Sequence, residues 1–393
     1  MDYAYLPVWA GDASALAGFQ LRVSPAGMTV DPTLGQIAWT PTTAQIGEHA
    51  VTLVAVVGGR DVEQQWTIRV SQATWFGVAL SPRGHSASTT TQDWVDHLTM
   101  PGVHGAVRSF HGAWRDSGMT NGEVPQLART GAQWALDYGF VAAFGFGWSD
   151  GAGNPDLTSD SEPSNNSWSN VETRREFREM VTAFAGQWQP RFLFLGNETN
   201  VWFQSHTQNE WMDWVSEFGE CYDAIKQASP ATEVFTVFQL EMMKGVGRHN
   251  GWSNAPQWQL LADHAATGKI DTFGFTVYPY FEHDTPGQVP DSYLQEIRAH
   301  WTSPVAFTEV AWPAMARPPY SGDEADQAAF VRRFLSLAAE LDVSYLSWLF
   351  VHDWDGQAST PAFTAVGLRA NDGTPRAADL AWQEEIAARE LRR

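Results

Sequence analysis

The chain has 393 residues, of which 44% are hydrophobic and 18% charged, and its formal net charge is −21. This composition is typical of a globular protein with enough apolar residues for two or three domains, or for one large barrel and a small module. The acidic charge argues against nucleic acid or an anionic membrane as partner, because both select basic surfaces. The sequence also has 20 tryptophans. Some belong in the core, but sugar faces stack on indole rings, so the excess favours a carbohydrate ligand.

Targeting and redox signals are few. Cys221 is the single cysteine, so no intrachain disulfide can form, and its position in a predicted helix indicates a buried, inert thiol. No run of 18 apolar residues predicts a transmembrane helix. The first residues, MDYAYLPVWAGD, lack the basic start and apolar stretch of a signal peptide. If a signal existed, we expect it to have been removed with any upstream sequence.

Residues 1–71 differ in pattern from the rest of the chain. Segments such as FQLRVSP, HAVTLVAVV and VEQQWTIRV alternate apolar and polar residues or are β-branched, with turn signals such as DPTLG and GGRD between them. Short strands at this spacing predict a small antiparallel β-sandwich. The PAGM turn, the GQIAWTP segment and the closing WTIRV strand resemble the cadherin-like or immunoglobulin-like repeats of secreted bacterial proteins. That resemblance implies a secreted or cell-surface bacterial protein, and a domain whose usual first strand is missing before Met1.

Residues 72–393 repeat a strand, a loop and a helix. Helical patterns such as EVPQLARTGAQWALDYG and EADQAAFVRRFLSLAAEL alternate with continuous apolar strands, which predicts βαβ units around a parallel sheet. Eight such pairs fit a TIM (β/α)8 barrel. A doubly wound open sheet is the alternative, but no Gly-rich phosphate loop follows the first strand. The eight predicted strands are 75–80, 105–110, 140–148, 191–196, 233–240, 272–278, 305–312 and 344–351.

In a TIM barrel the chemistry lies at the carboxyl ends of the strands. Two of the predicted strands carry a glutamate there, Glu198 in RFLFLGNETN and Glu309 in AFTEVAWP. Glycoside hydrolysis needs one carboxylic acid to protonate the leaving oxygen and a second carboxylate to attack the anomeric carbon or to activate water. An Asn-Glu pair alone is weak, because Asn209-Glu210 repeats it where a helix opens. The pairing of two strand-end glutamates carries the prediction. The other polar or aromatic residues at predicted strand ends are Arg108, His111, Trp114, Arg115, Trp148, Asp150, Asn197, Tyr278, Tyr280, Trp348, His352, Asp353 and Asp355.

The segments FLGNETN, GFTVYPY, FTEVAWP and AVRSF resemble clan A of the glycoside hydrolases, and within it most closely the family 53 endo-β-1,4-galactanases. The resemblance spans most of residues 75–391. It implies a retaining endo-acting β-glycosidase with Glu198 as general acid/base and Glu309 as nucleophile. Asn197 would then donate to the sugar 2-hydroxyl, and Arg108 and Tyr278 would donate to Glu309. Trp348 would form the floor under the sugar.

Weaker candidates surround these residues, and each has an ordinary structural reading. Trp114, Trp148, Trp202 and Trp312 lie just beyond strand ends and fit either sugar platforms or loop packing. His111 fits a substrate contact or a loop anchor. His352 and Asp353 follow the last strand, where LFVHDWDGQAST does not match the family's usual segment, so the identity of the sugar stays open.

Cofactors and partners are expected to be few. The oxygen-rich segments 149–165 and 352–356 are conceivable Ca²⁺ sites, but neither has EF-hand spacing, so solvated acidic loops are the favoured reading. No zinc site is predicted. We expect a monomer that takes a polysaccharide or oligosaccharide. Two other functions stay open: a carbohydrate-binding or adhesion protein on a glycosidase-like barrel, and a barrel enzyme of other chemistry such as a lyase or a transglycosylase.

Overall fold

The computed structural model describes residues 3–7, 15–42, 45, 47–70, 73–84, 89–99, 104–116, 123–148, 156–159, 161–354 and 361–390. The chain separates into two compact units that meet between Ala73 and Thr74, two residues beyond the predicted domain boundary. Each unit has a hydrophobic core of its own. No helix of the described residues is long and apolar enough to cross a membrane.

The N-terminal unit consists of two three-stranded antiparallel sheets. β5 (Gly47–Val57) and β6 (Arg60–Val70) pair along their whole length. Gly58 and Gly59 join them at φ +55° and +77°, the left-handed pair that a two-residue hairpin turn requires. β2 (Leu16–Val23) completes this sheet, and the other sheet holds β1 (Tyr3–Tyr5), β4 (Ile37–Trp39) and β3 (Thr29–Val30). These sheets fit a small β domain, and the immunoglobulin-like assignment stays a prediction.

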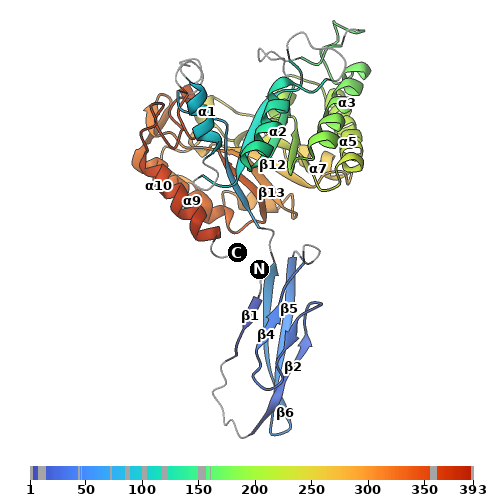
Figure 1. Ribbon diagram of the computed structural model, residues 1–393, viewed down its shortest axis with the longest axis vertical. Helices are drawn as coiled ribbons and strands as arrows, with labels where there is room; N and C mark the ends of the chain where they lie inside the picture. Colours follow the sequence, from blue (N-terminus) through green and yellow to red (C-terminus); the bar gives the residue numbers. More distant parts are fainter. Residues whose placement is uncertain are drawn as a thin grey trace. The chain divides into compact units, whose positions relative to one another are not determined.

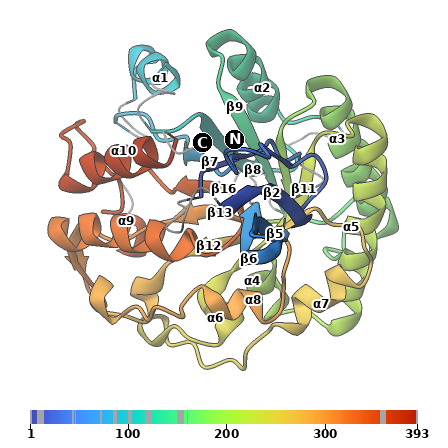
Figure 2. The same ribbon diagram turned by 90° about the horizontal axis from the view of Figure 1, so that it is seen from below.

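The second unit is a closed, parallel eight-stranded barrel, as the sequence predicts. Each predicted strand is a strand of the wall, and Figure 2 shows the helices ringing the barrel. In chain order the wall strands are β7 (Trp75–Ala79), β8 (Val107–Ala113), β9 (Val141–Gly147), β10 (Phe192–Leu195), β11 (Glu233–Gln239), β12 (Thr272–Val277), β13 (Val305–Val310) and β16 (Val343–Trp348).

Amphipathic helices cover the outside of this wall (Figure 1). α5 (Gln208–Ala228) begins with a capping box in which Thr207 and Glu210 bond each other's backbone. Glu210, of the Asn209-Glu210 pair that stands where this helix opens, is therefore a capping residue. The remaining helices are α1 (Thr91–Leu98), α2 (Gln126–Tyr138), α3 (Val171–Trp188), α4 (Thr199–Phe203), α6 (Leu240–Lys244), α7 (Gln259–Ala265), α8 (Gln295–Arg298), α9 (Glu324–Ala338) and α10 (Ala377–Glu390). The hairpin of β14 (Met315–Arg317) and β15 (Tyr320–Asp323), which the sequence did not predict, follows β13.

Alternation along the strands decides which side chains point into the barrel. The interior is filled by a separate cluster of mostly large apolar residues, which includes Val107 of β8, Phe194 of β10 and Tyr345 of β16. Residues of opposite parity face outward against the helices. β13 is the exception, because its register shifts after Phe307 and brings Glu309 to the barrel mouth although its parity is opposite to that of Ala306. Because of this parity, neighbouring residues of one strand lie in quite different environments.

Candidate active site

Glu198 lies at a sharp corner just after β10. The strand ends at Leu195, and Gly196 turns the chain with φ +75°. A Cβ at Gly196 would come within 2.7 Å of Trp148 and 2.5 Å of Thr199, so only glycine fits. Glu198 itself has φ +49°, a left-handed conformation that costs a non-glycine residue about 1–2 kcal/mol. Backbone strain of this kind concentrates at functional sites, where it holds a side chain in a required direction.

Glu309 lies near the end of β13 and is the acceptor of three side chains. Tyr278 donates its hydroxyl to Oε2, Asn197 Nδ2 lies 3.4 Å from Oε1, and His111 Nδ1 lies 3.3 Å from the same oxygen. The predicted Tyr278–Glu309 contact is present. His111 extends from β8 with the interior parity of Val107, and its place beside Glu309 was not predicted. The Glu309 side chain keeps 15% of its surface exposed at the barrel mouth.

Two donors from one strand and its end, Thr276 and Tyr278, contact the two glutamates. Thr276 Oγ1 donates to Glu198 Oε1 at 2.6 Å, and Tyr278, two residues along, donates to Glu309. Residues two apart on a strand point to the same face and lie about 7 Å apart along it. Asn197, the neighbour of Glu198, also reaches Glu309. The two carboxyl groups therefore share one small region of the barrel mouth.

The surroundings move the two pKa values in opposite directions. Burial, together with the negative charge of Glu309, raises the pKa of Glu198 to about 7. Burial also acts to raise the pKa of Glu309, but donation from His111, Tyr278 and Asn197 outweighs it and the pKa is lowered. One carboxyl group is thus held protonated near neutral pH while its partner is ionised, a division of labour typical of paired catalytic carboxylates.

Arg108 does not reach Glu309, and that prediction is wrong. Its parity on β8 is opposite to that of Val107 and His111, so the side chain leaves the barrel interior. It is fully buried and donates to the backbone carbonyls of Gly105 at 3.0 Å and Val107 at 2.9 Å. Burial lowers its pKa to about 10. His111 takes the place beside Glu309 that the sequence assigned to Arg108.

Trp348 is not a sugar floor, because its parity on β16 is opposite to that of Tyr345, which faces the interior. Its ring packs on Phe330 of α9 and Trp382 of α10, its indole N–H donates to Val366 O at 2.9 Å, and it is only 1% exposed. Trp312 is likewise fully buried, against Phe330 and Tyr280. Both predicted sugar contacts are core residues.

The other predicted platforms lie beyond the ends of β8, β9 and β10. Trp148 is 8% exposed and packs edge-on against Trp168, Trp202 and Trp214 beneath the Gly196 corner. Trp202, in α4, is partly exposed and stacks on His206 with ring centroids 3.7 Å apart. Of the predicted platforms, Trp202 is the one that keeps accessible surface close to Glu198 in the chain.

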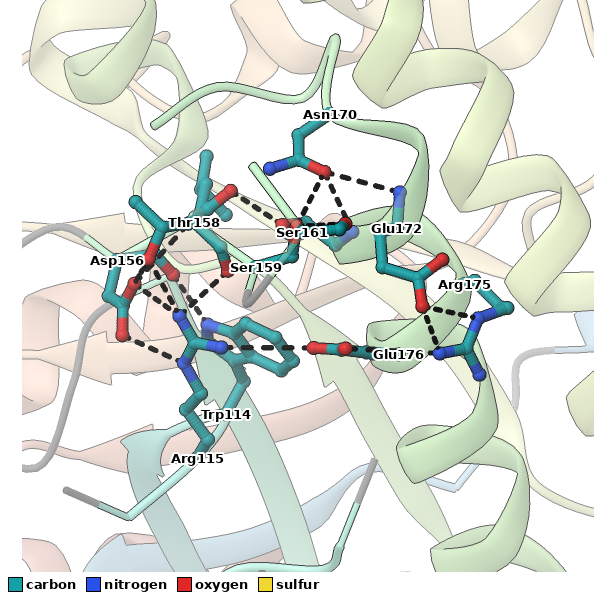
Figure 3. A network of polar contacts seen from close by, with 12 residues as sticks. Trp114, Arg115, Asp156, Thr158, Ser159, Ser161, Asn170, Glu172, Arg175 and Glu176 are labelled. Carbon is teal, nitrogen blue, oxygen red and sulfur yellow. Dashed lines mark hydrogen bonds and ion pairs between the residues drawn. The ribbon is translucent and has the colours of Figure 1, made fainter. Parts of the chain in front are cut away.

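Trp114 belongs to a polar network that ties the two loops together (Figure 3). Its indole N–H donates to Asp156 O at 2.7 Å, and Arg115 lies over its ring while pairing with the Asp156 carboxylate and approaching Glu176. Trp114 is therefore an anchor of the loop rather than a sugar platform.

Asp353 is not free to bind a substrate. It forms a bidentate ion pair with Arg376, at 2.5 and 2.9 Å, and accepts a hydrogen bond from the N–H of Gly367. The neighbouring His352 is buried, with Nδ1 2.8 Å from Ser81 O. Asp150 and Asp355, the other acidic residues predicted here, lie outside the described residues. Within the described residues, no group of three or more His, Cys, Asp or Glu could hold a metal ion.

Besides the position of His111, two polar residues of the site, Thr276 and Glu241, were not predicted. Thr276 was hidden in GFTVYPY, although its spacing of two from Tyr278 is a usable signal. Glu241, in FQLEMMK, is buried at the start of α6 and accepts the Tyr278 N–H at 3.0 Å. Nothing in the sequence distinguishes it from an ordinary helical glutamate.

The sequence was compared with protein-family models and with curated proteins. Residues 178–341 match the model of glycosyl hydrolase family 53, a stretch that runs from α3 to the end of α9 and holds both glutamates. No curated protein sequence matches the chain.

Several solved structures share the fold at low sequence identity. A GH5_18 protein from Streptomyces cattleya in complex with GlcNAc is 15% identical, with TM-score 0.63 over 82% of each chain. A family 39 glycoside hydrolase from Bacteroides cellulosilyticus WH2 is 14% identical, with TM-score 0.55 over 94% of this chain and 77% of that one. A bacterial Ig-like domain-containing GH10 xylanase from termite gut is 14% identical, with TM-score 0.53 over 98% and 96%.

Proposed function

We propose that this chain, a TIM-barrel glycoside hydrolase by its family match and fold, is a retaining β-glycosidase that cleaves within a polysaccharide. Glu309 would attack the anomeric carbon while Glu198 protonates the leaving oxygen. In the second half, Glu198 would take a proton from water as the water displaces Glu309 from the sugar. The observation that carries the proposal is the pair of carboxyl groups with opposite pKa shifts at the mouth of the barrel.

The neighbours fit these roles. Glu198 must be protonated to act as an acid, and its raised pKa keeps it so up to about pH 7. Glu309 must be ionised to attack, and its donors favour the ionised form. Asn197 lies next to both and is proposed to donate to the sugar 2-hydroxyl in the transition state. The 3.4 Å spacing of its Nδ2 from Glu309 is long for a hydrogen bond, so exchanging it for a substrate contact costs little.

The class of substrate is proposed from the family match and the net charge of the chain. The family match makes β-1,4-galactan the first polysaccharide to test, with β-glucan, β-mannan and xylan beside it. A neutral glycan also suits a chain of net charge −21. We propose a monomer. The resemblance of the N-terminal unit to repeats of secreted bacterial proteins implies that it acts outside the cell or at the cell surface.

The test is a polysaccharide panel read by reducing ends and product length, with Glu309→Gln as the key variant. We expect cleavage of one glycan, and a loss of several orders of magnitude in turnover in the variant with its melting temperature kept. Glu217→Gln is the matched control, because Glu217 is a buried glutamate of α5 that pairs with Arg178 of the neighbouring helix α3. It should leave turnover unchanged.

Three results would contradict the proposal. Turnover within tenfold of wild type in Glu309→Gln would exclude Glu309 as the nucleophile. Binding of a glycan without cleavage would favour the adhesion reading. Products longer than the substrate would favour a transglycosylase.

A further inference from the structure

A third carboxyl group lies behind the proposed catalytic pair. Glu241 follows β11 directly, in the first turn of α6, and is completely buried. Its Oε1 accepts the Tyr278 N–H at 3.0 Å and the Tyr293 hydroxyl at 2.5 Å, and its Oε2 accepts the Gln239 side-chain amide. All three groups donate a hydrogen bond to the Glu241 carboxyl group. A protonated carboxyl group would face only donors among these contacts, which favours the carboxylate. Burial raises the pKa of Glu241, and donation from Tyr293 and the Tyr278 N–H, with the charge of Lys244, acts against that rise.

The direction of the Gln239 amide is fixed. Its Oε1 accepts the Met242 N–H at 2.6 Å, which leaves its NH2 group to face Glu241. A glutamine at position 241 would therefore set one amide nitrogen against another, or turn its oxygen away from Tyr278. The isosteric change removes both the charge and one hydrogen bond.

Glu241 also takes part in a continuous series of hydrogen bonds that runs from the segment after Glu198 to Glu309. Asn200, two residues after Glu198, accepts the backbone N–H of Gln239 at 2.8 Å and donates to its carbonyl at 3.0 Å. The Gln239 side chain then binds Glu241, which binds the Tyr278 backbone. The Tyr278 hydroxyl ends the chain on Glu309.

We infer that Glu241 is a positioning residue of the catalytic pair, which fixes Tyr278 against Glu309 and places a third buried carboxyl group behind Glu198. This inference rests on the proposed function. It assigns a role to a residue that touches neither the substrate nor the reacting atoms.

The charged and titratable groups around Glu241 determine the sign of its effect. Glu198 faces it from the end of β10, and the negative charge of Glu241 contributes to raising the pKa of Glu198. Tyr280 and Tyr293 face it as neutral phenols, and burial holds the pKa of each well above the usual value. Lys244 lies 3.6 Å from the centre of the Tyr293 ring, with Nζ 3.3 Å from Glu296.

Removal of this charge acts on both carboxyl groups of the pair. Without the Glu241 anion, the pKa of Glu198 falls, and the basic limb of activity moves to lower pH. With Tyr278 less firmly held, Glu309 loses part of its donation, its pKa rises, and the acidic limb moves to higher pH. The bell-shaped profile thus narrows from both sides. A residue that served only the stability of the barrel would lower activity without moving either limb.

The experiment compares wild type, Glu241→Gln and the control Glu217→Gln. Carboxyl titrations are followed by 13C NMR of glutamate labelled at Cδ, assigned with Glu198→Gln and Glu309→Gln, and the pH profile of kcat/KM is measured beside them. In Glu241→Gln we expect each limb to move inward by about half a pH unit or more, and kcat/KM at the optimum to fall about tenfold. Glu217→Gln should leave both limbs in place.

Unchanged titrations of both glutamates in Glu241→Gln overturn the inference. If Glu241→Gln does not fold, Tyr293→Phe decides, because it removes one donor to Glu241 and should move both limbs in the same directions by a smaller amount. No shift in that variant also overturns the inference. A wild type without turnover on any glycan counts against the proposed function, whereas the NMR titration still decides the role of Glu241.

Discussion

Thr276 is the most direct handle on the proposed acid. Its hydroxyl donates to Glu198 at 2.6 Å from inside the barrel wall, and this contact lowers the pKa of Glu198 against the effect of burial. Thr276→Val keeps the shape and removes the donor. The account predicts that the pKa of Glu198 rises and that the basic limb of kcat/KM moves to higher pH.

The size of the shift follows from the contact. A hydrogen bond to a charged group contributes about 1.5–3 kcal/mol, and one pKa unit corresponds to about 1.4 kcal/mol, so the shift is about one to two units. The pKa of Glu198 starts at about 7. The basic limb should therefore lie at about pH 8 to 9 in the variant.

The assay is the pH profile of kcat/KM on the natural polysaccharide, whose leaving group needs protonation. Thr276→Ser keeps the hydroxyl and should restore the wild-type limb. Thr308→Val is the matched control, because Thr308 is a buried threonine of the neighbouring strand that contacts Phe275 O instead. A basic limb that stays in place or moves down in Thr276→Val would refute the assignment of Glu198 as the acid.

Two further predictions concern stability. Because the folded pKa of Glu198 is about 7 and its ordinary value is 4.5, the native state binds more protons than the unfolded state between these values, so stability falls as pH rises through that window. Glu198→Gln escapes this loss and should be more stable by about 1–2 kcal/mol above pH 7, after discounting for partial exposure, and equal to wild type below about pH 4.5. Urea unfolding at pH 4 and pH 8 checks this, and equal differences at both would contradict it. Trp348→Phe should lower stability by about 1–3 kcal/mol with KM unchanged. A raised KM with unchanged stability would return Trp348 to the sugar site.

The barrel and its pair of glutamates were predictable from the sequence because both are properties of whole strands. Apolar runs of strand length, separated by amphipathic helices, leave few arrangements, and the carboxyl ends of parallel strands must meet at one face. Glu198 and Glu309 each follow or close such a run. The Tyr278–Glu309 contact was expected together with one from Arg108, and the strand pattern alone did not separate the right expectation from the wrong one.

Inward and outward parity was not predictable. Barrel strands are buried on both faces, so AVRSF and SYLSWLFV show no alternation from which direction could be read. Arg108 and Trp348 were assigned to the barrel interior because each stands near the end of a strand. Each has the opposite parity to the interior residues of its strand and therefore points outward. His111 and Thr276 have the interior phase and make the contacts.

Partners that come together only through the closed barrel were equally hidden. Asp353 looks free in the sequence, but Arg376, 23 positions on, pairs with it. Glu241 follows β11, Tyr278 follows β12, and Tyr293 lies in the loop between β12 and α8. Their contacts depend on the register of β11 and β12 and on the path of that loop.

The central claim is double displacement through Glu309 with Glu198 as acid/base, and the anomeric configuration of the first product tests it most directly. Proton NMR of the reducing end, recorded before mutarotation during cleavage of the β-linked glycan that the panel identifies, distinguishes the two outcomes. The account predicts that the β-anomer appears first and the α-anomer only later, by mutarotation. Initial release of the α-anomer would mean inversion by a single displacement and would contradict the role given to Glu309.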